Sequence, residues 1–201
     1  MRTTLNSAAR ITAALALCAG AATAVPHART QSPTLSSPEA AALASLRWRS
    51  IGPANPGGRI TVVAGIPGKP EVFYVAGAAG GIIKTTNGGV TFTPIFDNEP
   101  VASIGDIEIA PSNENVVWVG TGEGDPRNST SFGNGVYRST NGGATWTHIG
   151  LDDSERIKRI ALHPTNPDVA YVCALGHAWG PNEEGGVFRT TNGGQSWKKV
   201  L

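Results

Sequence analysis

Three internal repeats constrain the fold of this 201-residue chain more than any other feature. Residues 81–92, 135–146 and 186–197 share the pattern Gly-[Val/Ile]-x-[Lys/Arg]-[Ser/Thr]-Thr-Asn-Gly-Gly-x-[Ser/Thr]-[Phe/Trp]. The shared asparagines Asn87, Asn141 and Asn192 lie 54 and 51 residues apart. A second matched piece, an apolar segment that ends in proline, precedes each copy. Repeats of about 50 residues with two matched parts indicate a repeat architecture rather than a single irregular domain.

Each repeat divides into four short predicted strands. Turn residues separate the first two strands, and a loop of variable length leads to the third. An Asn-Gly-Gly turn then returns the chain to a fourth strand that carries Phe92, Trp146 or Trp197. Asn-Gly predicts a hairpin in which both of these residues take positive φ. The predicted first strands are 60–67, 104–111 and 157–164, the second 72–76, 116–120 and 169–173, and the third 82–85, 136–139 and 187–190.

The remaining sequence agrees with an all-β fold. No amphipathic helical period appears after Leu46. Gly (26) and Pro (14) supply many turns, while 40% hydrophobic residues suffice for a core and argue against disorder. Four-stranded units of about 50 residues in series predict a β-propeller with four-stranded blades.

The turn segments carry a resemblance to a known family. Residues 139–146 (STNGGATW) resemble the Asp-box, or bacterial neuraminidase repeat, of pattern S-x-D-x-G-x-[ST]-W. The other two copies have Thr for Ser, and the first has Phe for Trp. The wider run 48–201 is similar to the large secreted bacterial propellers grouped with the sortilin-type and xyloglucan-cleaving propellers. The resemblance implies the same propeller fold.

All three turns have Asn where the Asp-box usually has Asp. An amide oxygen still accepts backbone N–H bonds across a turn, but it cannot act as a general base and is a weaker ligand for hard cations. We therefore expect structural turns, with weak calcium binding as the alternative. The residues assigned this structural role are Asn87, Gly89, Phe92, Asn141, Gly143, Trp146, Asn192, Gly194 and Trp197.

The repeats predict about three blades, at residues 57–97, 101–151 and 155–201. Residues 48–52 (WRSIG) match 146–150 (WTHIG), so residues 47–52 are predicted to be a fourth strand that closes a ring. Closed propellers typically have four to eight blades, so three blades and one strand form an incomplete ring. We expect an N-terminal fragment of a longer protein. Self-association of short chains, for example two chains with six blades, is the alternative.

The N-terminal residues predict export. Residues 1–24 read as a signal peptide, with Arg2 and Arg10 before a short apolar stretch and an A-x-A site at 22–24. An uncleaved anchor is the alternative, but the stretch is shorter than the 20 or so residues that span a bilayer. Residues 25–46 read as a linker. We expect a periplasmic or secreted domain at 47–201 without a membrane span, in which Cys173 has no disulfide partner.

Charge excludes one class of partner. The chain has 16 Lys and Arg against 15 Asp and Glu, a formal net charge of +1. Nucleic-acid binding needs a basic face, so we expect no nucleic-acid partner.

The candidate site lies on loops. In a propeller, the loops between second and third strands emerge on the same face as the connections between blades, and the Asn-Gly-Gly turns emerge on the opposite face. Residues 52–59, 121–135 and 175–185 are therefore predicted to form one loop face, where function is usually placed. Glu123, Asp125, Glu183 and Glu184 are the candidate catalytic carboxylates, and Arg59, Arg127, His177 and Trp179 are the candidate binding residues.

These residues support two functions. We expect a binding scaffold for a polypeptide or a glycan; in the enzyme alternative, Trp179 offers a flat apolar surface for a sugar ring. The alternative is part of a glycoside hydrolase, which needs two carboxylates about 5–10 Å apart. A structural or assembly role is the third possibility. His177 with Glu183 suggests a metal only weakly, because no cluster with zinc-ligand spacing exists; we expect neither metal nor cofactor.

Overall fold

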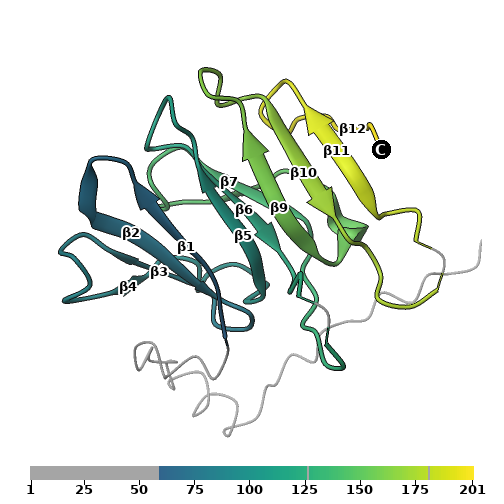
Figure 1. Ribbon diagram of the computed structural model, residues 1–201, viewed down its shortest axis with the longest axis horizontal. Coiled ribbons are helices and arrows are strands. Elements are labelled where there is room, and N and C mark those ends of the chain that lie inside the picture. Colours follow the sequence, from purple (N-terminus) through teal and green to yellow (C-terminus); the bar gives the residue numbers. More distant parts are fainter. Residues whose placement is uncertain (1–58, 126, 181) are drawn as a thin grey trace, which may run out of the picture. The chain divides into compact units, whose positions relative to one another are not determined.

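The computed structural model describes residues 59–125, 127–180 and 182–201. The predicted signal peptide (1–24), linker (25–46), closing strand (47–52) and all of the loop 52–59 except Arg59 lie outside the described residues. The described part contains three four-stranded antiparallel sheets that follow one another in chain order (Figure 1). Its helical content is a single 3₁₀ turn, η1 (Asp152–Ser154). This all-β architecture confirms the predicted fold class.

Each sheet contains the four strands of one repeat in sequence order. The first sheet contains β1 (Ile60–Ile66), β2 (Lys69–Gly77), β3 (Ile82–Thr85) and β4 (Thr93–Pro94). The second contains β5 (Ile104–Ile109), β6 (Val117–Thr121), β7 (Val136–Ser139) and β8 (Thr147–His148). The third contains β9 (Ile157–Leu162), β10 (Ala170–Ala174), β11 (Gly186–Thr190) and β12 (Lys198–Lys199).

The outer strands differ from the prediction. β4, β8 and β12 have two residues each and begin directly after the aromatic residue that they were expected to carry. In the second and third sheets, the aromatic side chain is hydrogen-bonded to the preceding sheet. The indole Nε1–H of Trp146 donates to the carbonyl of Ile95 (2.7 Å), and that of Trp197 donates to the carbonyl of Ile149 (2.7 Å).

The Asn-Gly-Gly turns also differ from the prediction in one respect. Positive φ falls on the two glycines, for example Gly142 (66°) and Gly143 (90°), and Asn141 keeps negative φ. The asparagine instead works through its side chain. Asn141 Oδ1 accepts the backbone N–H of Thr145 (2.9 Å), and its Nδ2 donates to the Thr145 hydroxyl (2.8 Å). The hydroxyl of Ser139 accepts the N–H of Gly143 (2.8 Å), and the other two turns repeat this network.

Asn141 therefore offers a test of the turn. We expect Asn141→Ala to lower the free energy of unfolding by about 1–2 kcal/mol, because the backbone N–H of Thr145 loses its acceptor. Asn141→Asp should cost less, because a carboxylate still accepts that bond. Urea unfolding followed by circular dichroism measures both values. Equal losses for the two variants would contradict an acceptor role for Asn141.

The core lies between the sheets. The inner strands β1, β5 and β9 are neighbours, so the sheets pack face to face along the chain. One apolar cluster joins Tyr74 and Ile82 of the first sheet to Ile104 of the second. Another joins Trp118 of the second sheet to Ile157 of the third. Each sheet thus depends on its neighbour to bury its apolar face, as expected for stacked repeats.

Candidate functional site: the loop face

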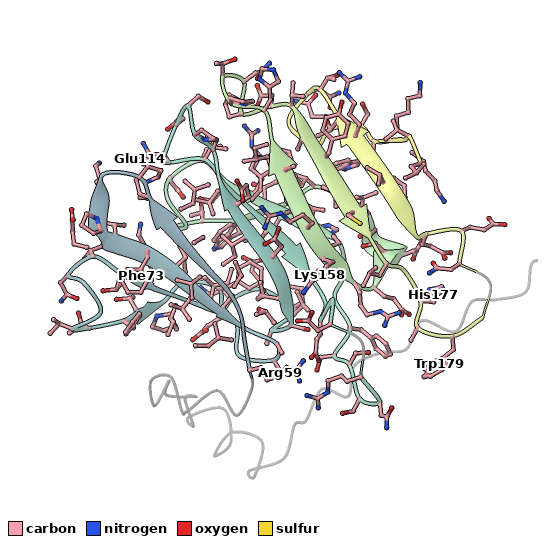
Figure 2. The ribbon with its side chains drawn as sticks, viewed as in Figure 1. Arg59, Phe73, Glu114, Lys158, His177 and Trp179 are labelled. Atoms are coloured by element: carbon pink, nitrogen blue, oxygen red, sulfur yellow. The ribbon has the colours of Figure 1, made fainter. Side chains whose placement is uncertain are left out.

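Among the described residues, Arg59 and the predicted loops 121–135 and 175–185 lie toward one end of the strands, which we call the loop face. The β6–β7 loop binds the segments that enter β5 and β9, through Gly122 N–H to Ser103 O (2.8 Å) and Gly133 N–H to Glu155 O (2.7 Å). The β10–β11 loop likewise begins with Leu175 N–H bound to Arg156 O (2.8 Å). Figure 2 shows Arg59, His177 and Trp179 toward this end of the strands and Glu114 at the opposite end.

Two of the candidate catalytic carboxylates are engaged by cations. Glu123 forms an ion pair with Arg59, and its side chain is only 2% exposed. Asp125 forms an ion pair with Lys158 of β9, and both of these side chains are about half exposed. The burial of Glu123 leaves little of its carboxylate within reach of a ligand. Sequence reasoning missed Lys158. The alternation of residues in a strand does not show which polar residue of that strand contacts a loop of the neighbouring sheet.

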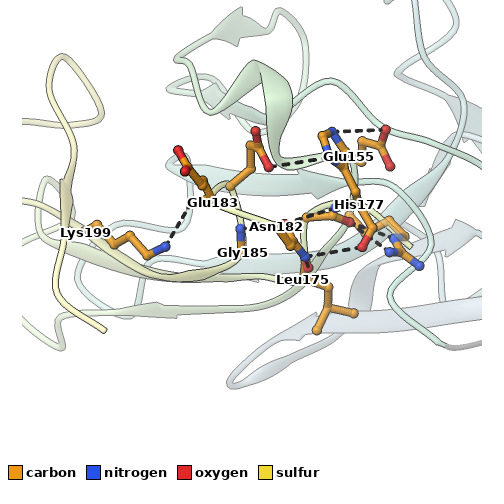
Figure 3. Close-up of polar contacts among 10 residues, drawn as sticks. Glu155, Leu175, His177, Asn182, Glu183, Gly185 and Lys199 are labelled. Carbon is orange, nitrogen blue, oxygen red and sulfur yellow. Dashed lines mark hydrogen bonds and ion pairs between the residues drawn. The ribbon is translucent and has the colours of Figure 1, made fainter. Parts of the chain in front are cut away.

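His177 lies between two carboxylates. Its Nε2 is 3.4 Å from Glu155 Oε1, and its Nδ1 is 3.5 Å from Glu184 Oε2 (Figure 3). Glu155 belongs to the connection that follows η1, whereas His177 and Glu184 belong to the β10–β11 loop. The prediction named His177 and Glu184 but not Glu155. A protonated His177 would join these two segments electrostatically.

Arg156 and Asn182 shape the β10–β11 loop, and the prediction missed both. The buried guanidinium of Arg156 donates from Nε (3.0 Å) and from an Nη (2.9 Å) to the carbonyl of Gly176. Asn182 Oδ1 accepts the backbone N–H groups of His177 (3.2 Å) and Gly185 (2.9 Å), and its Nδ2 donates to the carbonyl of Leu175 (Figure 3). The β10–β11 loop is therefore held in place by Asn182, which belongs to the loop, and by Arg156, which lies just before β9.

A pocket opens beside this loop, which we call the acidic pocket. Its volume is about 330 Å³. Two of the buried atoms on its walls, Ser154 Oγ and Glu184 Oε2, have no hydrogen-bond partner in the part of the chain that the structure describes. Lys199 reaches its rim, where Nζ donates to the carbonyl of Glu183 (2.8 Å) and lies 6.0 Å from the centre of the Phe188 ring. The lining residues are Leu151, Asp152, Asp153, Ser154, Glu183, Glu184 and Phe188.

Exposed aromatic residues also belong to the loop face. Trp179 is 84% exposed in the β10–β11 loop, and Phe132 is exposed in the β6–β7 loop. Arg127 donates to the hydroxyl of Ser129 (2.8 Å) within the same loop as Phe132. Trp179 is therefore the largest apolar side chain that the loop face leaves in water.

A second hollow of about 940 Å³ runs along the inner strands β1 and β5 and reaches Arg159 of β9. Its lining is mainly apolar or backbone, with Glu108 and Glu114 as the carboxylates. Burial raises the pKa of Glu108, while the nearby charge of Arg159 acts in the opposite direction. None of the predicted site residues lines this hollow, so the loop face remains the better candidate.

Asp106, on β5, is a buried carboxylate that joins two sheets. Its Oδ2 accepts the backbone N–H of Ile160 (2.7 Å) in β9. Burial raises the pKa of Asp106, and the bond from Ile160 and the charge of Arg159 offset only part of this effect. The folded state therefore binds the proton more tightly than the unfolded chain does, and this group's contribution to stability falls as the pH rises from about 4 through the raised pKa.

Asp106→Asn tests this dependence. Asn does not titrate, and its amide oxygen still accepts the bond from Ile160. We expect the variant to gain stability relative to the parent as the pH rises through that window, which urea unfolding at several pH values will measure. A difference that stays constant with pH would contradict the raised pKa of Asp106.

Two classes of feature are not found among the described residues. Within 59–125, 127–180 and 182–201, no three His, Cys, Asp or Glu side chains are grouped as a metal site requires. Within the same described residues, no helix is long and apolar enough to cross a membrane.

Comparisons with known proteins identify the fold. No protein-family model matches the chain, and no curated protein matches it either. Among solved structures, an ancestral GH74 enzyme matches 74% of this chain with 28% identity and a TM-score of 0.58. The GH74 xyloglucanase from Xanthomonas campestris matches 77% with 21% identity and a TM-score of 0.53, and YCF48 bound to D1 peptide matches 77% with 18% identity and a TM-score of 0.50.

The fold is that of a β-propeller. The three sheets are its blades, and β1, β5 and β9 are their inner strands. The chain spans only 19%, 22% and 45% of the lengths of these three proteins.

Proposed function

We propose that this chain is a binding module of an exported β-propeller, and that its loop face binds a polypeptide through a basic side chain of that polypeptide. The acidic pocket carries the proposal. The export follows from the signal peptide predicted at residues 1–24, and the turns are assigned to the Asp-box type on their sequence pattern.

The chemistry of the acidic pocket suits an ammonium or guanidinium group. Four carboxylate residues surround it, and Phe188 offers an aromatic face, on which cations bind favourably. Ser154 Oγ and Glu184 Oε2 are buried acceptors that an incoming N–H group can satisfy. A volume of about 330 Å³ suits one long side chain. Lys199 at the rim already places an ammonium group near Phe188 and the carbonyl of Glu183.

The same geometry favours binding over hydrolysis. A glycoside hydrolase needs two carboxylates that reach the scissile bond. Glu123 is buried against Arg59, and Asp125 contacts Lys158. Glu183 and Glu184 remain of the four predicted carboxylates, but they are adjacent residues of one loop, so the predicted pair with one carboxylate from each of two loops is not available.

A glycan is the second candidate ligand, because Trp179 is 84% exposed. A flat ring of this kind can stack against a sugar. The similarity to GH74 enzymes agrees with this reading, and the similarity to YCF48 bound to D1 peptide agrees with the first. Trp179→Ala should abolish glycan binding and leave capture of a lysine-containing peptide largely intact, which separates the two ligands.

Calorimetric titration of the chain with short peptides tests the proposal. We expect peptides with Lys or Arg to bind and their Glu-substituted counterparts not to bind. The double variant Glu183→Gln/Glu184→Gln should weaken binding about tenfold or more, because charge-assisted hydrogen bonds contribute roughly 1.5–3 kcal/mol each. Binding should also weaken as salt rises.

Glu114→Gln is the matched control. Glu114 is a partly exposed carboxylate in an ion pair with Lys69 (2.6 Å), at the opposite end of the strands. This variant should bind peptides as the parent does. Equal binding of basic and acidic peptides would refute the proposal, and binding of xyloglucan oligosaccharides alone would favour the glycan.

A further inference from the structure

Glu184 connects the acidic pocket to His177. Its Oε2 is a buried oxygen on the wall of the pocket, and it accepts no hydrogen bond from the residues that the structure describes. The same oxygen lies 3.5 Å from Nδ1 of His177, which does not itself line the pocket. A cation inside the pocket and a proton on His177 are therefore both attracted to the negative charge of one carboxylate.

His177 is placed so that both of its ring nitrogens lie beside a carboxylate. Its Nε2 is 3.4 Å from Glu155 Oε1, and its Nδ1 is the atom beside Glu184 (Figure 3). A neutral imidazole has one N–H and one lone pair, so it can donate to only one of these carboxylates while its lone pair is directed at the other. An imidazolium ion has two N–H groups. Only the imidazolium ion satisfies both contacts.

The charged groups around this loop come from three segments and include two cations. Arg156 donates to the carbonyl of Gly176, and Lys199 donates to the carbonyl of Glu183 (2.8 Å). Arginine, lysine and carboxylate side chains ordinarily keep their charges between pH 5 and 8, whereas imidazole ordinarily changes its charge there. The histidine is therefore the group whose charge we expect to vary. The charged groups are Asp152, Asp153, Glu155 and Arg156 from η1 and the connection after it, Glu183 and Glu184 from the loop itself, and Lys199 from β12.

A second histidine lies beside the pocket but is coupled to it less directly. Nε2 of His148 is 3.5 Å from Asp152 Oδ1, on the pocket wall, and it donates to the carbonyl of Asn134 (2.6 Å). The His148 ring also lies 4.9 Å from the ring of Tyr137. The Asp152 side chain is 70% exposed, against 32% for Glu184, so water screens the charge of Asp152 more strongly. We therefore expect His148 to have the smaller effect on the pocket.

We propose that His177 makes the binding of a cation in the acidic pocket dependent on pH. Below the pH at which His177 loses its proton, the imidazolium ion shares the charge of Glu184 and the ligand binds weakly. Above that pH the imidazole is neutral, the charge of Glu184 is available to the ligand, and binding is tight. The coupling is reciprocal, because a bound cation must also lower the affinity of His177 for its proton. The inference rests on the proposed function, since it takes the ligand to be basic.

Calorimetric titration at several pH values tests this coupling. The probe is a Gly-Lys-Gly peptide with both ends blocked, so that its charge is that of the lysine ammonium group. The dissociation constant of the parent chain should rise about fivefold or more between about pH 8 and about pH 5.5, a typical size for coupling between two sites. His177→Gln, which keeps an N–H donor but carries no charge, should bind the peptide about equally at both pH values.

Two other histidines serve as control positions. His163 lies in the β9–β10 turn, at the end of β9 opposite to Arg156, where its Nδ1 accepts the backbone N–H of Thr165 (3.3 Å). His163→Gln should therefore keep the full pH dependence of the parent, and His148→Gln should keep most of it. If His177→Gln keeps the full pH dependence, the inference is wrong. Loss of the pH dependence in His148→Gln alone would also overturn it, because the effect would then belong to His148.

A measurement without ligand separates failure of this inference from failure of the proposed function. The imidazole signals of His177 are followed by NMR over the same pH range. They should show that His177 loses its proton at a lower pH in Glu184→Gln than in the parent, because one of the two carboxylate charges is gone. Identical titrations in both proteins, or a dissociation constant that does not change with pH, would overturn the inference alone. No peptide binding at any pH would overturn the proposed function and this inference together.

Discussion

Trp118→Ala is expected to lower the free energy of unfolding by about 3–5 kcal/mol. Trp118 is fully buried between the second and third blades, where it packs edge-on against Trp197 with ring centres 6.2 Å apart. It also lies beneath the guanidinium of Arg138. Alanine would leave a cavity at the interface and expose the third blade to independent unfolding. Urea unfolding by circular dichroism gives the value.

Two control variants show whether the stability depends on the packing of Trp118 at the interface rather than on the loss of any tryptophan. Trp118→Tyr should cost clearly less than the alanine variant, because tyrosine fills the same position in the first blade as Tyr74. The buried indole N–H of Trp118 has no partner among the described residues, so its loss costs no hydrogen bond there. Trp179→Ala removes an exposed indole and should change stability by no more than about 0.5 kcal/mol. Similar losses for Trp118→Ala and Trp179→Ala would contradict the interface.

Gly122→Ala is expected to cost about 3–5 kcal/mol, the combined cost of a side chain at positive φ and of overpacking. Gly122 has φ of 85°, and a Cβ there would overlap the carbonyl oxygen of Glu155 in the connection to the third blade. That carbonyl also accepts the N–H of Gly133. The substitution should therefore loosen the loop face as well as the interface between the second and third blades. Thermal unfolding and peptide binding measure the two effects.

Gly68→Ala is the matched control. Gly68 has a similar φ of 80° in the β1–β2 turn, but no atom lies within 4 Å of the position that a Cβ would take. It should cost only the roughly 1–2 kcal/mol of a left-handed backbone. If Gly122→Ala and Gly68→Ala lower the free energy of unfolding by the same amount, the close approach of the Glu155 carbonyl to Gly122 does not explain the cost of Gly122→Ala.

Local features of the sequence were enough to predict the fold and most strand positions. The repeated turns are short-range structures, so Asn141, Gly142 and Gly143 predict a hairpin from their own chemistry. β3 and β7 begin and end where the pattern placed them. The prediction was wrong about which turn residues take positive φ, because an Asn side chain that accepts N–H bonds four residues ahead leaves the left-handed positions to the glycines.

The partners of the site residues could not be predicted in the same way. The sequence placed Arg59, Glu123, Asp125, His177 and Glu184 on one face, but it did not show which of them pair. It also missed the partners Lys158 and Glu155. The Arg59–Glu123 pair joins segments 64 residues apart, and it and the Asp125–Lys158 pair form only because one blade stacks on the next. The contacts of His177 with Glu155 and Glu184 form within the third blade, through the folding of its loops.

Sequence by itself therefore determined the repeat, the four-stranded blade and the face that carries the loops, because each depends on residues close together in the chain. Tertiary structure alone decided which carboxylates are paired with cations and where the acidic pocket opens. The reason is physical: an ion pair, a pocket and a buried face all require surfaces from two segments, and their distance is set by blade packing rather than by local backbone preference.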